Sequence, residues 1–292
     1  MKTIQWLFMA LAAVSLGACS EEGLEPDSIF GPEPGVVENA FDAWLYTNYT
    51  RPYNITFKYR LEDRETDPQY NLVPADYTKS IALAKMTQHV WIDSYIELID
   101  STFIRTYCPK VLFLVGSLGY NDGEVVLGTA EGGMKIVLYN VNAIDPDNLN
   151  LEMLNYYFFH TMHHEFAHIL HQTKSYSTDF NLISPADYTS GSWVNVGSQQ
   201  ALDMGFITPY GSSEPQEDFV EIFSTYVTRT AGYWNSLVGS AGAMGQSKIN
   251  QKLEIVRDYM LTTWGIDMDV LREIVLRRSN EVLTMNDLTT LN

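Results

Sequence analysis

The stretch His160-Thr161-Met162-His163-His164-Glu165-Phe166-Ala167-His168-Ile169-Leu170-His171 decides how this chain is interpreted. His164 and His168 are four residues apart, so a helix places both imidazoles on one face, with Cβ atoms about 5–6 Å apart. Two histidines placed in this way can bind one Zn²⁺ at about 2.0–2.1 Å. Glu165 directly follows the first histidine, where its carboxylate can accept a proton from a zinc-bound water. The pattern therefore predicts a catalytic zinc site on a helix.

A catalytic zinc usually takes three protein ligands and leaves one position for water. The class with the pattern His-Glu-x-x-His-x-x-Gly-x-x-His is excluded, because His171 and Lys174 occupy the glycine and final histidine positions. A carboxylate from a later helix is the other common source, and Glu217 and Glu221 lie four residues apart at the start of such a helix. One can bind zinc while the other hydrogen-bonds a histidine ligand. Acids in a first turn can also simply complement the helix dipole.

The later run Glu217-Asp218-Phe219-Val220-Glu221-Ile222-Phe223, together with the His-Glu-x-x-His helix, resembles the glutamate-zincins. It is similar in particular to the peptidase domain of anthrax-lethal-factor-like toxins. This resemblance implies that Glu217 is the third zinc ligand and that Glu221 does not bind zinc but hydrogen-bonds a histidine ligand. It also implies that Tyr210 hydrogen-bonds the oxyanion of a tetrahedral intermediate. Tyr210 lies in a Pro-Tyr-Gly sequence, which suits an ordinary loop tyrosine equally well.

Three more histidines flank the motif. His160 lies one turn before His164 on the same face, where it could line the cleft or steady a ligand. His163 points away from that face by about 100° and is expected to be an ordinary helix histidine. His171 lies near His168 and could support that ligand from behind. None of the three is expected to bind zinc itself.

The mature sequence as a whole is similar to a family of lipoproteins described as substrate-import-associated zinc metallohydrolases. The shared segments are Tyr53–Arg60, Val90-Trp91-Ile92, the His-Glu-Phe-Ala-His helix, the Glu-Asp-Phe-Val-Glu helix and the lipobox described below. The similarity implies a zinc site, hydrolase chemistry and an association with TonB-dependent importers of outer membranes. It leaves the substrate open.

The N-terminus reads as a secretory signal. Lys2 precedes an apolar run from Ile4 to Leu16, and Leu16-Gly17-Ala18-Cys19 resembles the lipobox of bacterial lipoproteins. We therefore expect residues 1–18 to be a signal peptide, Cys19 to carry the lipid that anchors the chain to a membrane, and residues 19–38 to be a flexible tether. The acidic start of the tether suits either a signal for the cell surface or a solvated linker. The expected location is the outer membrane, facing the cell surface or the periplasm.

The net charge excludes some classes of binding partner, and the cysteine count excludes disulfides. The formal net charge of −18 argues against nucleic acids and anionic membrane surfaces as partners. After Cys19, Cys108 is the only cysteine, so no disulfide within the mature domain is expected. Cys108 precedes an apolar run and is expected to be a buried, small apolar residue.

The order of elements predicts an α+β fold over residues 39–292, zincin-like by the resemblance, with a small mixed sheet and a mainly helical C-terminal part. The expected strands are 55–61, 111–115, 124–129 and 134–141, with a hairpin turn at Glu131-Gly132-Gly133. Residues 134–141 are the candidate sheet edge for a bound substrate strand. The expected helices are 38–49, 75–100, 148–173, 214–230, 247–263 and 268–283, with a long loop over 174–213.

Three functions fit these patterns. The first is a lipid-anchored zinc peptidase that cleaves peptides or glycopeptides for import, with Glu165 as general base. The second is a non-catalytic lipoprotein that keeps the zincin fold as a binding module of an import complex. A zinc hydrolase of non-peptide amides or esters is a third. The presence of Glu165 favours catalysis, because a binding module gains nothing obvious from a general base.

Overall fold

The computed structural model describes residues 39–62, 71–121, 124–126, 128–131 and 134–291. The expected signal peptide 1–18, Cys19 and the tether 19–38 lie outside the described residues. Contacts group Ala40–Asn292 into one compact unit, to which every element below belongs. Within the described ranges, each helix is either too short or too polar to cross a membrane.

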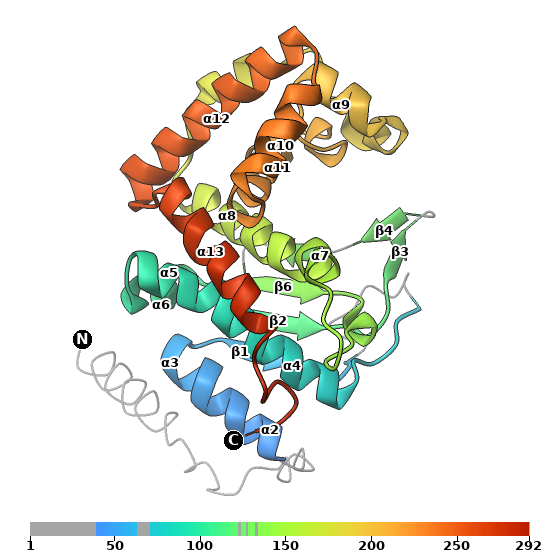
Figure 1. Ribbon diagram of the computed structural model, residues 1–292, viewed down its shortest axis with the longest axis vertical. Helices are drawn as coiled ribbons and strands as arrows, with labels where there is room; N and C mark the ends of the chain where they lie inside the picture. The colour runs from blue at the N-terminus through green and yellow to red at the C-terminus, as the bar shows by residue number, and fades with distance from the viewer. Residues whose placement is uncertain (1–38, 63–70, 122–123, 127, 132–133, 292) are drawn as a thin grey trace, which may run out of the picture. The chain divides into compact units, whose positions relative to one another are not determined.

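A four-stranded sheet has the strand order β1-β2-β6-β5 (Figure 1). Its strands are β1 (Thr56–Lys58), β2 (Val111–Leu114), β5 (Gly128–Glu131) and β6 (Lys135–Leu138). Strands β1, β2 and β6 run parallel, whereas β5 is antiparallel to β6. A second, two-stranded sheet pairs β3 (Gly119–Asn121) with β4 (Glu124–Val126). A mixed sheet with helices agrees with the predicted α+β class.

Strand β2 is buried on both faces, as its continuous apolar sequence predicted. Leu112 and Leu114 are fully buried in the larger core, and Phe113 is fully buried in a smaller cluster. The partner positions are apolar as well, with Leu112 opposite Ile136. Near-continuous apolar runs are typical of strands covered on both sides in parallel sheets.

The prediction that residues 134–141 form the sheet edge is wrong. Strand β6 lies inside the sheet between β2 and β5, and β5 takes the edge. The sequence of β6 is Lys-Ile-Val-Leu, whose three apolar residues are buried on both faces, so an inner position suits it. The sequence of β5 is Gly-Thr-Ala-Glu, a short and more polar strand that suits an edge. An antiparallel pairing with the preceding strand is confirmed by the register Gly128 opposite Leu138, but the predicted strand 124–129 is wrong in its bounds, because Glu124–Val126 is β4 of the second sheet and the partner strand is β5.

Most predicted helices are confirmed to within a few residues, and three of them contain a π-helical segment. The predicted helix 38–49 comprises α2 (Ala40–Leu45) and η1 (Tyr46–Thr50), and it continues into α3 (Arg51–Tyr53). The predicted helix 75–100 comprises α4 (Tyr77–Thr87), η3 (Gln88–Ile92) and α5 (Asp93–Leu98). The predicted motif helix comprises α7 (Leu151–Leu154), η5 (Asn155–Phe159) and α8 (His160–Thr173). The later predicted helices appear as α10 (Pro215–Thr228), α12 (Ala243–Trp264) and α13 (Met268–Val282).

Several segments differ from the prediction. The expected strand 55–61 is only the three residues of β1, and Asn54, with a left-handed backbone, ends α3 two residues before it. The expected loop 174–213 contains α9 (Ser198–Met204) and the short helices η6 (Thr178–Leu182), η7 (Ser190–Asn195) and η8 (Tyr210–Ser212). Helices α6 (Ser101–Tyr107) and α11 (Ala231–Ser240) were not predicted. Helices α6, α9 and α11 are only seven to ten residues long, too short to show a clear helical periodicity, so tertiary packing decides their structure.

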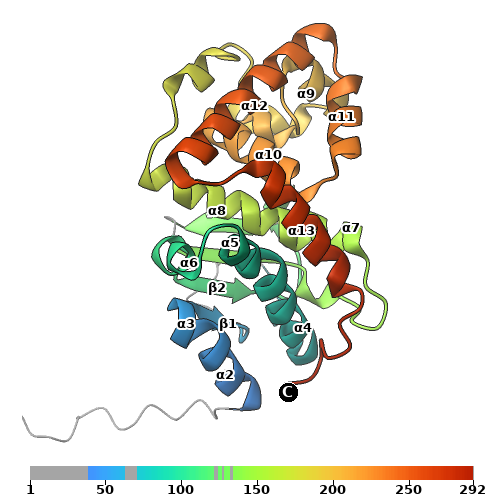
Figure 2. The same ribbon diagram turned by 60° about the vertical axis from the view of Figure 1, so that its left-hand side comes forward.

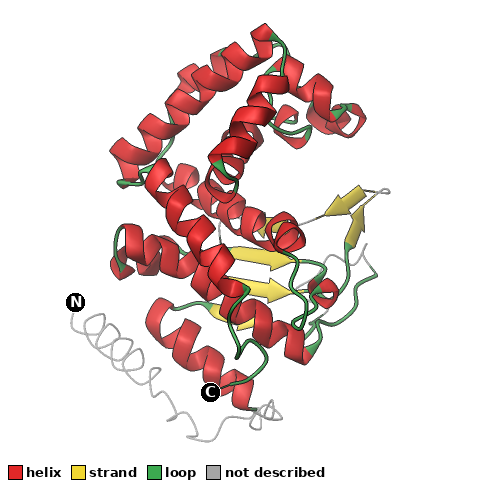
Figure 3. Ribbon diagram, viewed as in Figure 1, coloured by secondary structure: helices red, strands yellow, loops and turns green. Residues whose placement is uncertain are grey.

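Helix α8 lies between the sheet and α10. It contacts β5, β6 and α10. Figures 1 and 2 show α8 between the sheet strands and α10. From Leu151 to Leu291, which the structure describes without a gap, the regular elements are all helices (Figure 3). The His-Glu-x-x-His motif thus lies on a helix that packs against both the sheet and the helical half of the domain.

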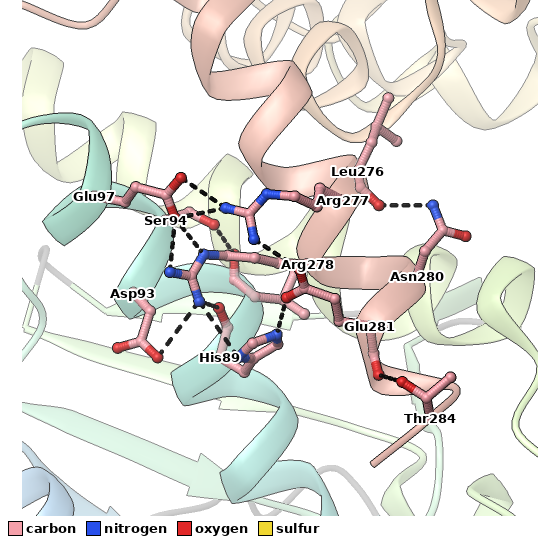
Figure 4. A network of polar contacts seen from close by, with 11 residues as sticks. His89, Asp93, Ser94, Glu97, Leu276, Arg277, Arg278, Asn280, Glu281 and Thr284 are labelled. Atoms are coloured by element: carbon pink, nitrogen blue, oxygen red, sulfur yellow. Dashed lines mark hydrogen bonds and ion pairs between the residues drawn. The ribbon is translucent and has the colours of Figure 1, made fainter.

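A charged network fastens the last helix to the middle of the chain. Arg277 and Arg278 of α13 both bind Glu97 of α5, at 2.6 and 2.7 Å (Figure 4). Glu281 of α13 binds His89 Nε2 of η3 at 2.9 Å. Because each partner in this network is at least partly exposed, it contributes orientation more than stability.

A buried ion pair links α10 to α12. Lys252 Nζ lies 2.7 Å from Asp218 Oδ2, and both side chains are fully buried. Lys252 also donates to the Gly205 carbonyl at 2.8 Å, and Tyr188 donates to the same Asp218 oxygen at 2.9 Å. The Lys252 ammonium lies 4.0 Å from the centroid of the Phe206 ring. These contacts hold the segment that contains α9 against the first turn of α10.

Replacing Lys252 by methionine is expected to destabilise the domain by about 3 kcal/mol, because it leaves the buried Asp218 carboxylate without its cation. Thermal unfolding of the zinc-free protein measures the effect as a fall of about 6–12 °C in Tm. Lys248→Met is the matched control, because the Lys248–Asp187 pair is partly exposed and is expected to contribute less than about 1 kcal/mol. Equal effects of the two substitutions would contradict the importance of the buried pair.

Candidate metal centre

Helix α8 places His164 and His168 on one buried face. Both histidines are less than a tenth exposed, and their ring centroids are 4.9 Å apart. The opposite face carries Phe166, whose ring packs edge-on against Trp91 and Tyr95 at 5.5 and 4.9 Å. This aromatic packing fixes the rotation of the helix about its axis, so the two imidazoles are directed at α10.

Helix α10 brings Glu217 to the two histidines. Glu217 Oε2 lies 3.1 Å from His164 Nε2 and 3.2 Å from His168 Nε2. Ligands bound at about 2.0–2.1 Å to a tetrahedral zinc lie about 3.3 Å from one another. The three donor atoms are therefore spaced as ligands of one zinc ion, and the set of two imidazoles and a carboxylate suits that metal.

The second nitrogen of each of these histidines also has a partner. His164 Nδ1 lies 2.7 Å from Glu221 Oε1, and Thr208 donates to Glu221 Oε2 at 2.7 Å. His168 Nδ1 lies 2.9 Å from His171 Nε2. A carboxylate that accepts from Nδ1–H fixes the tautomer and leaves the Nε2 lone pair free for a metal. Glu221 and His171 thus lie where the sequence placed them, behind the candidate ligands.

Replacing Glu221 by glutamine is expected to weaken zinc binding by about 10- to 100-fold, because the neutral amide holds the His164 tautomer less firmly. Competition with a chromophoric chelator measures the affinity directly. Glu273→Gln removes an exposed carboxylate on α13 and serves as the control. An unchanged affinity in Glu221→Gln would show that the hydrogen bond to His164 does not tune the metal.

The acids of the centre differ in their affinity for protons. Burial opposes ionisation of Glu217, but hydrogen bonds to His164 and His168 outweigh it and lower the pKa of Glu217. Burial likewise opposes ionisation of Glu221, yet His160 and His164 lower its pKa to about 2. Burial raises the pKa of Glu165, although the two motif histidines counteract it. Glu217 and Glu221 are thus anions, as a ligand and its partner must be, while Glu165 accepts a proton most readily.

Tyr210 is brought to the centre by η8. Its ring stacks on His164 with centroids 6.0 Å apart and an angle of 29° between the planes. Burial raises the pKa of Tyr210, and the carboxylates of Glu217 and Glu165 raise it further. The phenol is therefore protonated at neutral pH and available as a hydrogen-bond donor.

The remaining motif histidines are structural. His163 is fully buried and lies 2.9 Å from the Tyr95 hydroxyl, so it points away from the centre as predicted. Its burial lowers its pKa to about 3. His160 Nε2 lies 2.9 Å from Ser224 Oγ and 3.5 Å from Glu221 Oε1. His160 thus lies beside the outer partner of His164 rather than beside Glu217.

A second group of possible ligand atoms comes from His160, His164 and Glu221. It uses His164 Nδ1, which already lies within hydrogen-bonding distance of Glu221. The group that includes His168 and Glu217 uses Nε2 of both histidines, while their Nδ1 atoms keep their own partners Glu221 and His171, and we take it as the metal centre.

Sequence reasoning missed two residues of this region. Thr208 holds Glu221, and Trp193 packs edge-on against Tyr210 with ring centroids 5.0 Å apart. Both lie in the segment 174–213, which was expected to be a plain loop. The only sequence feature that could have pointed to this region was Trp193 itself, a tryptophan in an otherwise polar, uncharged stretch.

Two histidines and a carboxylate that converge from adjacent helices, with a buried glutamate beside them, define the class of metal-dependent hydrolases. Residues 35–269 match the model of a family described as "putative zinc-binding metallo-peptidase", and the chain belongs to this family. A crystal structure from Bacteroides caccae, described by the same words, superimposes with a TM-score of 0.76 at 42% sequence identity. That match covers 91% of this chain and 100% of the neighbour. A search among curated proteins finds no match.

The family and the structural neighbour are both described as zinc-binding, which confirms zinc as the metal expected from the sequence. They equally support the metallopeptidase class. The mixed fold, with its small sheet and many helices, fits such an enzyme.

Proposed function

We propose that this metallopeptidase hydrolyses peptide or glycopeptide bonds at a centre of the glutamate-zincin type, with zinc held by His164, His168 and Glu217. The observation that carries the proposal is the convergence of two imidazole nitrogens on one carboxylate: Glu217 Oε2 lies 3.1 Å from His164 Nε2 and 3.2 Å from His168 Nε2, on the side of α8 that faces α10. When bound, zinc supplies Lewis-acid chemistry that acidifies a water and polarises a carbonyl.

The residues of the chain supply the proton transfers and the positioning. Glu165 removes a proton from the attacking water and then delivers it to the leaving amine. Tyr210 donates its phenolic hydrogen to the developing oxyanion. Glu221 and His171 keep the imidazoles of His164 and His168 in place.

Cleavage of a mixed library of peptides and glycopeptides, read by mass spectrometry, tests this function. The purified mature protein should cleave members of the library and carry one zinc per chain. Zinc at unit stoichiometry without cleavage would favour a non-catalytic binding module, or a hydrolase of other amides or esters. Absence of zinc would contradict the centre itself.

We also propose that the mature chain is a lipoprotein of the outer membrane, anchored at Cys19 and working beside a TonB-dependent importer. Support comes from the sequence Leu16-Gly17-Ala18-Cys19 after an apolar run, and from the family resemblance of the whole chain. The enzyme would shorten substrates at the cell surface or on the periplasmic side before uptake. Metabolic labelling with palmitate tests the anchor, and a Cys19→Ala variant should lose both the label and the membrane fraction.

A further inference from the structure

An aromatic column extends from the metal centre along the segment 174–213. His164 stacks on Tyr210, and Tyr210 is met edge-on by Trp193, whose ring plane is turned by 73°. Tyr210 is 37% exposed and Trp193 is half-buried, so solvent reaches both rings. An indole therefore lies two rings away from a candidate zinc ligand.

The segment that carries Trp193 is fastened to the segment that carries Tyr210. Thr189 N donates to Ser212 O at 2.8 Å, and Ser190 N donates to Ser213 O at 3.0 Å. A turn of helix follows directly, closed by the bond from Val196 N to Trp193 O at 2.9 Å. These backbone hydrogen bonds hold the backbone of Trp193 near Tyr210, which reduces the ordering needed when a substrate binds.

The stretch of sequence around Trp193 contains no charged residue. Residues 188–202 carry no Asp, Glu, Lys or Arg, in a protein with 18 basic and 36 acidic residues. Val194, next to the tryptophan, is 42% exposed. The uncharged rings of Trp193 and Tyr210 favour neutral, apolar groups, and the carboxylates of Glu217 and Glu165 beside Tyr210 disfavour phosphate and carboxylate groups.

We infer that Trp193, together with Tyr210, forms a subsite that binds an aromatic or large aliphatic side chain next to the scissile peptide bond. This inference rests on the proposed function, because it places the subsite beside the metal centre. Trp193 acts as a specificity residue: it contacts the substrate side chain and takes no part in proton transfer. Rings of this kind prefer offset or edge-on contacts with a second flat group, which an aromatic side chain provides.

Two small zinc-binding probes test the subsite without requiring a known substrate. N-acetyl-phenylalanine hydroxamate and N-acetyl-glycine hydroxamate present the same metal-binding group with and without a large side chain. Calorimetry on the zinc-loaded full-length mature protein should give a Kd about tenfold lower for the phenylalanine probe. Trp193→Ala should abolish this ratio, Trp193→Phe should retain most of it, and Tyr46→Ala, an exposed aromatic residue of η1, should leave it unchanged.

The outcomes separate this inference from the proposed function. Equal affinity of zinc-loaded wild-type protein for the two probes would overturn the subsite, as would a ratio that survives in Trp193→Ala. Tightest binding of a third probe, an N-acetyl-serine hydroxamate that carries N-acetylgalactosamine, would also overturn it in favour of a sugar site. A purified protein without zinc would contradict the proposed function instead.

Discussion

Replacing Glu165 by glutamine leaves zinc bound at unit stoichiometry and lowers kcat for peptide cleavage by about 10²- to 10⁴-fold. Glutamine has almost the same shape as glutamate but cannot accept a proton from the attacking water. Glu165 is only 6% exposed, so bulk water cannot easily take over the transfer. Metal analysis of the purified variant and steady-state kinetics on one cleaved peptide measure both parts of this expectation.

The expected pattern is a loss in kcat with little change in KM, because Glu165 acts on the water and not on the bound peptide. Glu152→Gln is a suitable control, since this exposed glutamate of α7 pairs with Arg229 and is not among the candidate metal-binding residues. If Glu165→Gln cleaved peptides at the wild-type rate, another group would have to be the general base. Loss of zinc in this variant would instead make Glu165 a structural member of the centre.

Replacing Glu217 by glutamine is expected to weaken zinc binding by more than about 100-fold, which exceeds the usual effect of removing an outer partner of a ligand. The amide loses the negative charge that offsets the metal, while its shape is unchanged. Dialysis against a zinc buffer followed by metal analysis measures the affinity, and cleavage should fall in parallel with zinc content.

Glu214→Gln is the matched control for Glu217→Gln. Glu214 lies three residues earlier, at the N-cap of the same helix, and is exposed there. Glu214→Gln tests the alternative in which acids at this end of α10 only complement the helix dipole. That interaction contributes about 0.3–1 kcal/mol of stability, and its loss is expected to leave zinc affinity unchanged. Similar zinc affinities in the two variants would contradict the assignment of Glu217 as a ligand.

The sequence predicted the elements whose periodicity is strong. The helix with the His-Glu-x-x-His motif and the helix with Glu217 both appear where their apolar spacing placed them. Helix geometry accounts for the shared face of His164 and His168 on α8 and of Glu217 and Glu221 on α10. Residue spacing thus predicted the two histidines and a pair of candidate acids, and the resemblance to glutamate-zincins pointed to Glu217 within that pair.

Other features depend on tertiary packing that no local pattern reveals. Strand order is one of them, because the apolar run of β6 shows that it is buried but not which neighbours cover it. The partners of Thr208 and Trp193 are another, since both residues lie in a segment without periodicity and reach their partners across the fold. The buried pair of Lys252 and Asp218, 34 residues apart in sequence, was equally invisible.

Anomalous diffraction at the zinc absorption edge, from crystals of the mature protein, tests the central claim most directly. The expected result is one strong peak about 2.0–2.2 Å from Nε2 of His164, Nε2 of His168 and a carboxylate oxygen of Glu217. A peak among His160, His164 Nδ1 and Glu221, the other possible group of ligands, would contradict this centre. The absence of any peak at His164 and His168 from zinc-soaked crystals would contradict it as well.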